Sequence, residues 1–171
     1  MKWKLPHISK VYEALGAIAD HRLELLSRRA AKLGVMEARV YSYSRNKFYD
    51  VAYDASKNAL RPGSRQAIMS NDNSAYWKGE LGYPAIALLM QLGVLPFDSK
   101  IAESLKSIAW KDINQKHKND FDKTGLEVEG IAEAHGCPKE KLQKFSNEVL
   151  TKIEKLALVS LGPKQKPPAG Y

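Results

Sequence analysis

The chain has 171 residues, of which 44% are hydrophobic and 27% charged, a mixture typical of one globular domain with its own core. Its one cysteine, Cys137, excludes a disulfide within the chain and a zinc cluster of several thiolates. The net charge of +8 is compatible with a polyanionic partner, because lysine and arginine that neutralise phosphates release condensed counterions. It is equally compatible with a basic surface that is merely solvated.

The sequence predicts no membrane segment. The first residues lack the apolar run of a secretory signal, and the longest apolar stretch, Ala85 to Met90, is far too short to span a bilayer. We therefore expect a cytoplasmic protein with no membrane partner.

The first predicted element is an amphipathic helix from Pro6 to Asp20, because apolar residues recur there at helical spacing. From Arg22 to Leu33 the signals conflict. Leu23 and Leu25 alternate with charged residues as in a strand, whereas the composition of the second half favours a helix. We predict a helix, which Gly34 ends.

A hairpin is predicted over Ala38 to Tyr53, since β-branched and aromatic residues dominate and Ser44-Arg45-Asn46-Lys47 is the one turn-like break. We place Ser44 opposite Lys47. After a loop from Asp54 to Ser64, a third strand from Gln66 to Ser70 completes an antiparallel meander. The face expected in the core comprises Ala38, Val40, Tyr49, Val51 and Tyr53, and the other face comprises Arg39, Tyr41, Tyr43, Phe48 and Asp50, with Arg45 and Lys47 at the tip.

The rest of the chain is predicted to be helical. Pro84 to Leu92 is apolar on all sides and therefore central to the core. A helix begins near Asp98, residues 111–135 form one helix or two with weak points at the glycines, and the last helix runs from Pro138 to Gly162.

These elements give an α+β fold: an N-terminal helix, a three-stranded antiparallel meander and a helical C-terminal half packed on it. We expect one compact domain over residues 1–162, with a hairpin, strand and core-helix module at 38–92 and a helical part at 98–162. The Pro-, Gly- and Lys-rich residues 163–171 are expected to form a flexible tail.

The segment after the hairpin has a specific layout. Met69-Ser70-Asn71 precedes a spacer that contains Tyr76-Trp77-Lys78-Gly79, and Gly82-Tyr83-Pro84 then opens the apolar helix. Residues 38–92 thus resemble the SWIM-type zinc finger, which has a strand hairpin, a cysteine pair, a spacer that often carries tryptophan, a Cys-x-His pair and an apolar helix. This chain has Met69, Asn71, Gly82 and Pro84 at the ligand positions, so no metal or other cofactor is expected.

The resemblance implies a nucleic-acid-binding or protein-binding role, with packing in place of the lost metal. Tyr76, Trp77 and Tyr83 would fill the space that zinc organises, while the polar residues before them tie the loop to the backbone. The same loop also fits a capped turn before a core helix. The predicted structural loop comprises Asn71, Asp72, Asn73, Tyr76 and Tyr83.

The outer face of the hairpin is the predicted nucleic-acid-binding surface. Aromatic rings stack on bases, with roughly 1–3 kcal/mol per base, while arginine and lysine contact phosphates. The alternative is that a helix covers these rings. The predicted binding residues are Arg39, Tyr41, Tyr43, Arg45, Lys47, Phe48, Trp77 and Lys78.

No catalytic residue is predicted. The four histidines stand far apart, and the sequence has neither a glycine-rich phosphate loop nor a nucleophile elbow. A Ser or Asp brought near a histidine by the fold alone would escape this search. The predicted function is that of a small basic protein that binds DNA or RNA or associates with nucleoprotein. The alternative is a subunit that docks on a protein partner through its C-terminal helices, and an enzyme comes third.

Overall fold

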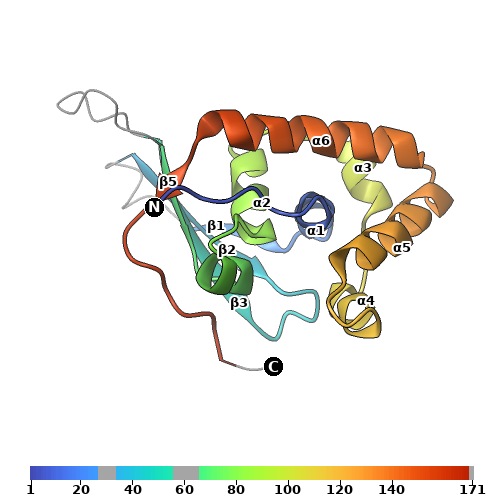
Figure 1. Cartoon of the computed structure of the whole chain (residues 1–171), viewed down its shortest axis with the longest axis horizontal. Helices are drawn as coiled ribbons and strands as arrows, with labels where there is room; N and C mark the ends of the chain where they lie inside the picture. Colours follow the sequence, from blue (N-terminus) through green and yellow to red (C-terminus); the bar gives the residue numbers. More distant parts are fainter. Residues whose placement is uncertain (27–33, 56–65, 170–171) are drawn as a thin grey trace.

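The strands form one sheet, and the helices gather on one side of it and extend well beyond one end (Figure 1). This computed structural model describes residues 1–26, 34–55 and 66–169. Within them the sheet order is β1-β2-β3-β4-β5, antiparallel throughout except for the parallel pair β4 and β5. The strands are β1 (Leu23–Leu26), β2 (Val35–Tyr41), β3 (Phe48–Asp54), β4 (Ala67–Ser70) and β5 (Val159–Ser160).

The α+β class is confirmed, with an N-terminal helix, the meander β2-β3-β4 and a helical C-terminal half. The hairpin faces are also confirmed, since the five residues expected in the core are buried. The register differs by two residues, because Ser42 rather than Ser44 faces Lys47, and the Ser42 amide donates to the Lys47 carbonyl oxygen at 2.9 Å. A shift of two leaves every side chain on its expected face, because side chains alternate with a period of two.

The predicted helix over residues 22–33 is wrong where the structure describes it. Leu23–Leu26 form β1, in which Leu23 lies opposite Val40 and packs against the core. Pairing with β2 satisfies the backbone and outweighs the weak helix propensity of this short segment. Residues 27–33 of the predicted helix, like 56–65 of the predicted loop, lie outside the described residues.

Two helices form the centre of the molecule. α1 (Ser9–Ala19) packs on α2 (Tyr83–Gln91), and α2 in turn covers the inner face of β2, β3 and β4. Every residue of α2 from Tyr83 to Met90 is buried, as its uniformly apolar sequence predicts. A short π-helix (Ser74–Lys78) joins β4 to α2.

The remaining helices surround α1. The predicted segment 111–135 is two helices, broken at residues 117–120, where Lys118 and Asn119 adopt positive φ, and not at its glycines. The last helix ends at Leu156 and not at Gly162, because Ala157 turns left-handed and Val159 pairs with β4. These helices are α3 (Ser99–Ser104), α4 (Trp110–Lys116), α5 (Phe121–Ala134) and α6 (Lys139–Leu156).

The segment after β5 returns along the molecule past the π-helix (Figure 1). Residues 163–169 contain no helix or strand, and Lys164 Nζ donates to the Tyr76 carbonyl oxygen at 3.0 Å. No helix in the described part of the chain is long and apolar enough to cross a membrane.

Candidate functional site

The outer face of the hairpin makes several contacts within the molecule. Arg39 Nε lies 3.4 Å from Asp50 Oδ1, and its guanidinium stands 4.5 Å from the centre of the Phe48 ring. The Tyr41 hydroxyl donates to Glu24 at 2.9 Å, and this hydrogen bond raises the pKa of Tyr41. Phe48 remains 36% exposed. The predicted charged groups on this face are therefore already engaged by neighbouring strands.

Arg45 at the hairpin tip anchors the tip to the end of α1. Its Nη2 donates to the carbonyl oxygens of Asp20 at 2.9 Å and His21 at 3.3 Å. The residue also has a left-handed φ of 58°, as the tight turn requires. Its guanidinium is thus directed towards the protein backbone.

The loop before α2 is held together by Asn71 and Asp72. The side-chain oxygen of Asn71 accepts from the Asp50 amide at 2.9 Å, which extends the pairing of β3. The buried Asp72 carboxylate accepts from Ser70 Oγ at 2.6 Å and from the amides of Ser74 at 2.9 Å and Ala75 at 3.2 Å. Burial raises the pKa of Asp72. These bonds hold the start of the π-helix in place.

The Asp72 carboxylate also explains why glycine stands at position 82, one of the four positions that correspond to zinc ligands in the SWIM-type finger. A Cβ on Gly82 would overlap the Asp72 side chain, so any larger residue at position 82 would force the Asp72 carboxylate to move. Within the described residues, no three His, Cys, Asp or Glu side chains come together as metal ligands would.

Trp77 does not fill the loop interior, contrary to the expectation. The π-helix directs it outward, where it is 73% exposed, and the Tyr76 ring packs edge-on against it at 4.7 Å. Three exposed lysines come from segments around it. Lys78 follows it, Lys164 binds the Tyr76 carbonyl, and the Lys4 amide binds the carbonyl of Gly79. We call these five residues the Trp77 surface: Lys4, Tyr76, Trp77, Lys78 and Lys164.

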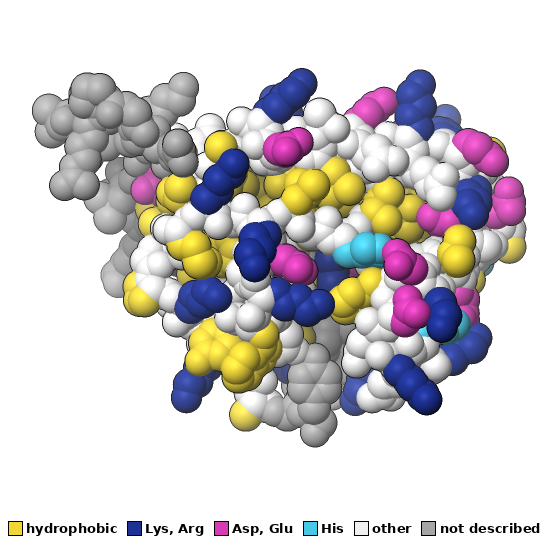
Figure 2. Space-filling model, in the orientation of Figure 1, with side chains coloured by type: hydrophobic (Ala, Val, Ile, Leu, Met, Phe, Trp, Pro, Cys, Tyr) yellow, Lys and Arg dark blue, Asp and Glu magenta, His cyan; other side chains and the backbone are white. Residues whose placement is uncertain are grey.

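The face of the molecule seen in Figure 2 carries hydrophobic side chains with both basic and acidic side chains between them. Lys78 Nζ also lies 4.6 Å from the centre of the Phe121 ring at the start of α5. Two of the predicted binding residues, Trp77 and Lys78, therefore belong to one surface. Lys4 and Lys164 are distant from them in the sequence, and the fold brings their segments to this surface. No spacing in the sequence indicates these two lysines.

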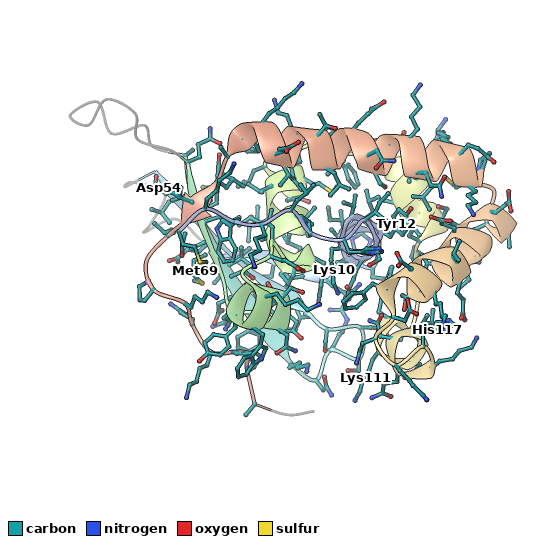
Figure 3. All side chains as sticks on the ribbon, viewed as in Figure 1. Lys10, Tyr12, Asp54, Met69, Lys111 and His117 are labelled. Atoms are coloured by element: carbon teal, nitrogen blue, oxygen red, sulfur yellow. The ribbon has the colours of Figure 1, made fainter. Side chains whose placement is uncertain are left out.

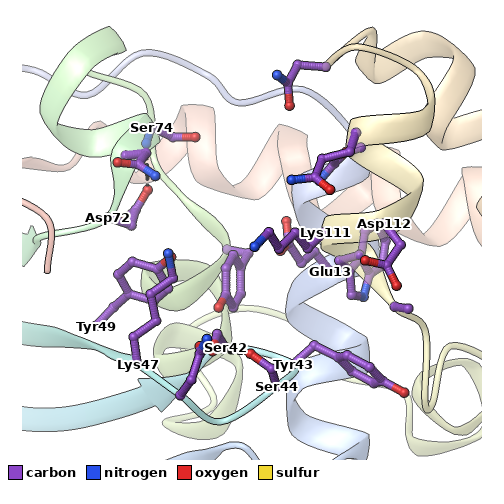
Figure 4. A pocket seen from close by; sticks show the side chains of 18 of the residues that line it. Glu13, Ser42, Tyr43, Ser44, Lys47, Tyr49, Asp72, Ser74, Lys111 and Asp112 are labelled. Carbon is purple, nitrogen blue, oxygen red and sulfur yellow. Dashed lines mark hydrogen bonds between the residues drawn. The ribbon is translucent and has the colours of Figure 1, made fainter. Parts of the chain in front are cut away.

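A cavity of about 650 Å³ lies between the hairpin tip, the Asp72 loop, α1 and α4. Lys47 extends into it from the hairpin, and Lys111 extends into it from α4 (Figure 4). Partial burial and the nearby charge of Lys111 lower the pKa of Lys47. The predicted binding residues Tyr43 and Lys47 line this cavity rather than the outer face.

The carboxylates around the cavity are largely engaged. Glu13 pairs with Lys10 at 3.0 Å, and Asp72 accepts the three hydrogen bonds described above. Asp112, on the first turn of α4, is the third carboxylate among the lining residues, and it is exposed. Lys10 on α1 and Lys111 on α4 (Figure 3) are distant in sequence but both line the cavity, which explains why the sequence did not reveal it.

Two tyrosines form an aromatic wall of the cavity. The rings of Tyr49 and Tyr83 meet edge to face, with centroids 6.0 Å apart. Burial raises the pKa of Tyr83 well above its ordinary value. Its hydroxyl points to the Tyr41 carbonyl oxygen at 3.5 Å, and the Arg22 guanidinium lies 5.8 Å from its ring centre. Tyr83, predicted as part of the structural loop, thus also contributes to the cavity.

The fold does bring a serine and an aspartate to one histidine. His7 Nδ1 lies 2.9 Å from Ser9 Oγ, and His7 Nε2 lies 3.0 Å from Asp122 Oδ1. In a hydrolase the serine is open to substrate and the carboxylate is buried. Here Ser9 is 2% exposed and the Asp122 side chain is 90% exposed. We therefore interpret the Ser9–His7–Asp122 contacts as structural: they connect the start of α1 to the start of α5.

Comparison with known proteins gives one match. Among curated proteins and among solved structures no match is found. Residues 3–159 match the family described as "Uncharacterised conserved protein UCP014422", and this range contains the cavity lining except Ala169, and the Trp77 surface except Lys164. The chain belongs to this family of uncharacterised conserved proteins, UCP014422.

Proposed function

We propose that the protein binds single-stranded nucleic acid, DNA or RNA, through the Trp77 surface. The observation that carries this proposal is the 73% exposure of an indole ring on a π-helix, with three exposed lysines on that helix and on the two segments hydrogen-bonded to it. π-Helical turns are rare and are frequent at functional sites. An exposed aromatic ring stacks on any base, while lysines follow the phosphate backbone.

The overall charge supports the same class of partner. The chain carries 27 Lys and Arg against 19 Asp and Glu. Phosphate contacts from such a surface supply most of the affinity of binding without sequence preference. The sequence resemblance of residues 38–92 to the SWIM-type zinc finger implies the same class of partner; the family that matches the chain carries no such description.

The proposal reassigns several predicted residues. Arg39, Tyr41 and Phe48 brace the hairpin, and Arg45 holds its tip, because each of them contacts neighbouring strands or the end of α1. Trp77 and Lys78 keep the binding role. Tyr43 and Lys47 are placed at the adjoining cavity.

Docking on a protein partner through the helical half is the alternative. Leu126 on α5 favours this alternative, because this apolar side chain is 58% exposed. Isolated exposed apolar residues are common on monomeric proteins, however, and need no partner. The outward positions of α6 are largely lysine and glutamate, which are depleted at the centres of protein interfaces.

A Trp77→Ala variant tests the proposal. We expect its affinity for a labelled single strand of about a dozen nucleotides to fall roughly 5- to 150-fold, because one stacking contact contributes about 1–3 kcal/mol. Fluorescence anisotropy at low salt measures this. Phe97→Ala is the matched control, since Phe97 is also an exposed aromatic residue, 43% exposed, but lies outside the Trp77 surface. Equal affinity of the wild type and Trp77→Ala, or no binding by either, would contradict the proposal.

A further inference from the structure

We propose that the cavity between the hairpin tip and α4 receives one nucleotide of the bound strand, with its phosphate between Lys47 and Lys111 and its base beside Tyr43, Tyr49 and Tyr83. This inference rests on the proposed function and adds a specific site for a nucleotide to it. The size fits: about 650 Å³ is within the usual range of roughly 300–1,000 Å³ for small-molecule sites and far exceeds what inorganic phosphate alone requires.

The charges around the cavity favour an anion at one position. Lys47 and Lys111 enter from opposite walls, so two positive charges are held near each other in a partly enclosed space (Figure 4). An anion placed between the two ammonium groups is attracted by both charges. Of the three carboxylates in the lining, Glu13 pairs with Lys10, Asp72 accepts hydrogen bonds from its own loop, and Asp112 is exposed on the first turn of α4.

The remaining lining suits a base. Tyr43 is 42% exposed at the hairpin tip, and the Tyr49 and Tyr83 rings lie deeper. Aromatic rings of this kind stack on unstacked bases, and amides read their hydrogen-bonding edges. The lining supplies amides from the hairpin tip, the Asp72 loop, α4 and the turn after α4, namely Asn46, Asn73, Asn114, Gln115 and Asn119.

The hairpin tip, which carries Tyr43, Asn46 and Lys47, is ordered by its own hydrogen bonds. The hydroxyls of Ser42 and Ser44 donate to Asn46 Oδ1 at 3.0 and 2.8 Å. Arg45 in turn fastens the tip to α1. A site built on groups held in place in this way loses less conformational entropy when a ligand binds.

The position of the cavity connects it with the Trp77 surface. Asn73 and Ser74 line the cavity, and Ser74 is the first residue of the π-helix whose fourth residue is Trp77. A strand that stacks on Trp77 is therefore within a few residues of the cavity wall. One nucleotide can leave the strand and enter the cavity while its neighbours stay on the surface.

Calorimetric titration with nucleoside 5′-monophosphates tests the inference. We expect binding by the wild type, and at least roughly tenfold weaker binding by Lys47→Gln and by Lys111→Gln, since each removes one charge from the phosphate position. Lys116→Gln is the matched control: it lies on α4 and loses the same charge, but it faces Glu127 outside the cavity. Circular dichroism verifies that each variant is folded.

The outcomes separate this inference from the proposed function. Monophosphate binding that is unchanged in Trp77→Ala but weakened in both cavity variants supports the cavity site. If wild-type protein binds oligonucleotides in a Trp77-dependent way but binds no monophosphate, the cavity assignment is wrong and the proposed function stands. The assignment is also wrong if inorganic phosphate binds as tightly as the monophosphates, or if the cavity variants behave as Lys116→Gln does. Monophosphate binding without any oligonucleotide binding would support the cavity and contradict the proposed function.

Discussion

Asp72 has the most consequential side chain of the loop before α2. A single buried carboxylate accepts one hydroxyl and two amides, and it occupies the space beside Gly82. The pair Asp72 and Gly82 thus sets the direction in which the π-helix presents Trp77. An Asp in a polar run followed by a Gly near a helix start could be predicted as a turn, but the contact between them could not, since it depends on the fold.

The raised pKa of Asp72 predicts a specific pH dependence of stability. Burial raises this pKa above its ordinary value of 3.8, so between these two values the folded protein holds a proton that the unfolded chain has lost. The contribution of Asp72 to stability is therefore greatest below about pH 4 and declines as the pH rises through the raised pKa. The total decline is about 1.4 kcal/mol for each unit by which folding raises this pKa. Urea unfolding across this range should show wild type losing stability relative to Asp72→Asn. A difference that stays constant from pH 4 to 7 would show that the carboxyl is not perturbed.

Two glycine substitutions should act in opposite directions. Gly82→Ala should lower the free energy of unfolding by about 1–3 kcal/mol, because the new methyl overlaps the Asp72 carboxylate in a packed loop. Gly130→Ala, in α5 with open space around it, should raise it by about 0.5–1 kcal/mol through helix propensity. Thermal or urea unfolding measures both. In an Asp72→Ala background the cost of Gly82→Ala should largely disappear, and a cost that persists would mean that the clash lies elsewhere.

At the level of elements, the sequence predicts those that carry a strong periodic pattern. The hairpin faces were predicted correctly even though the register was not, because an error of two residues does not exchange the faces of a strand. β1 and β5 were missed. In β1, Leu23 and Leu25 do alternate with charged residues as in a strand, but the helix propensity of the residues that follow outweighs this pattern in the prediction. β5 has only two residues and exists through pairing with β4, which local composition does not encode.

The hairpin tip should depend on its tether to α1. In Arg45→Ala the hydrogen bonds to the carbonyls of Asp20 and His21 are lost, so the amides of the tip should exchange with solvent faster. Hydrogen–deuterium exchange measures this. Arg39→Ala, which removes a surface ion pair in the middle of β2, should leave tip exchange nearly unchanged. Equal protection of the tip in Arg45→Ala and wild type would contradict the tether.

Over the whole molecule, the candidate site is a product of the topology. α6 runs back along the helical side to deliver β5 to the sheet, and the segment beyond β5 brings Lys164 to the Trp77 surface (Figure 1). α1 and α4 close the cavity against the hairpin tip. The sequence indicated Trp77, Lys78 and Lys47 through their residue types, but Lys4, Lys111 and Lys164 carry no local signal because they are assembled from distant segments.

The salt dependence of binding tests the central claim most directly. If the three lysines of the Trp77 surface each neutralise one phosphate of a single strand, the affinity should fall about 20-fold between 50 and 200 mM monovalent salt, since the logarithmic slope is roughly −0.7 for each contact. Anisotropy titration of the wild-type protein with a labelled single strand at the two salt concentrations gives this ratio. A salt-sensitive complex of this size is the predicted result. An affinity that does not change with salt, or the absence of a complex at 50 mM, would contradict the account.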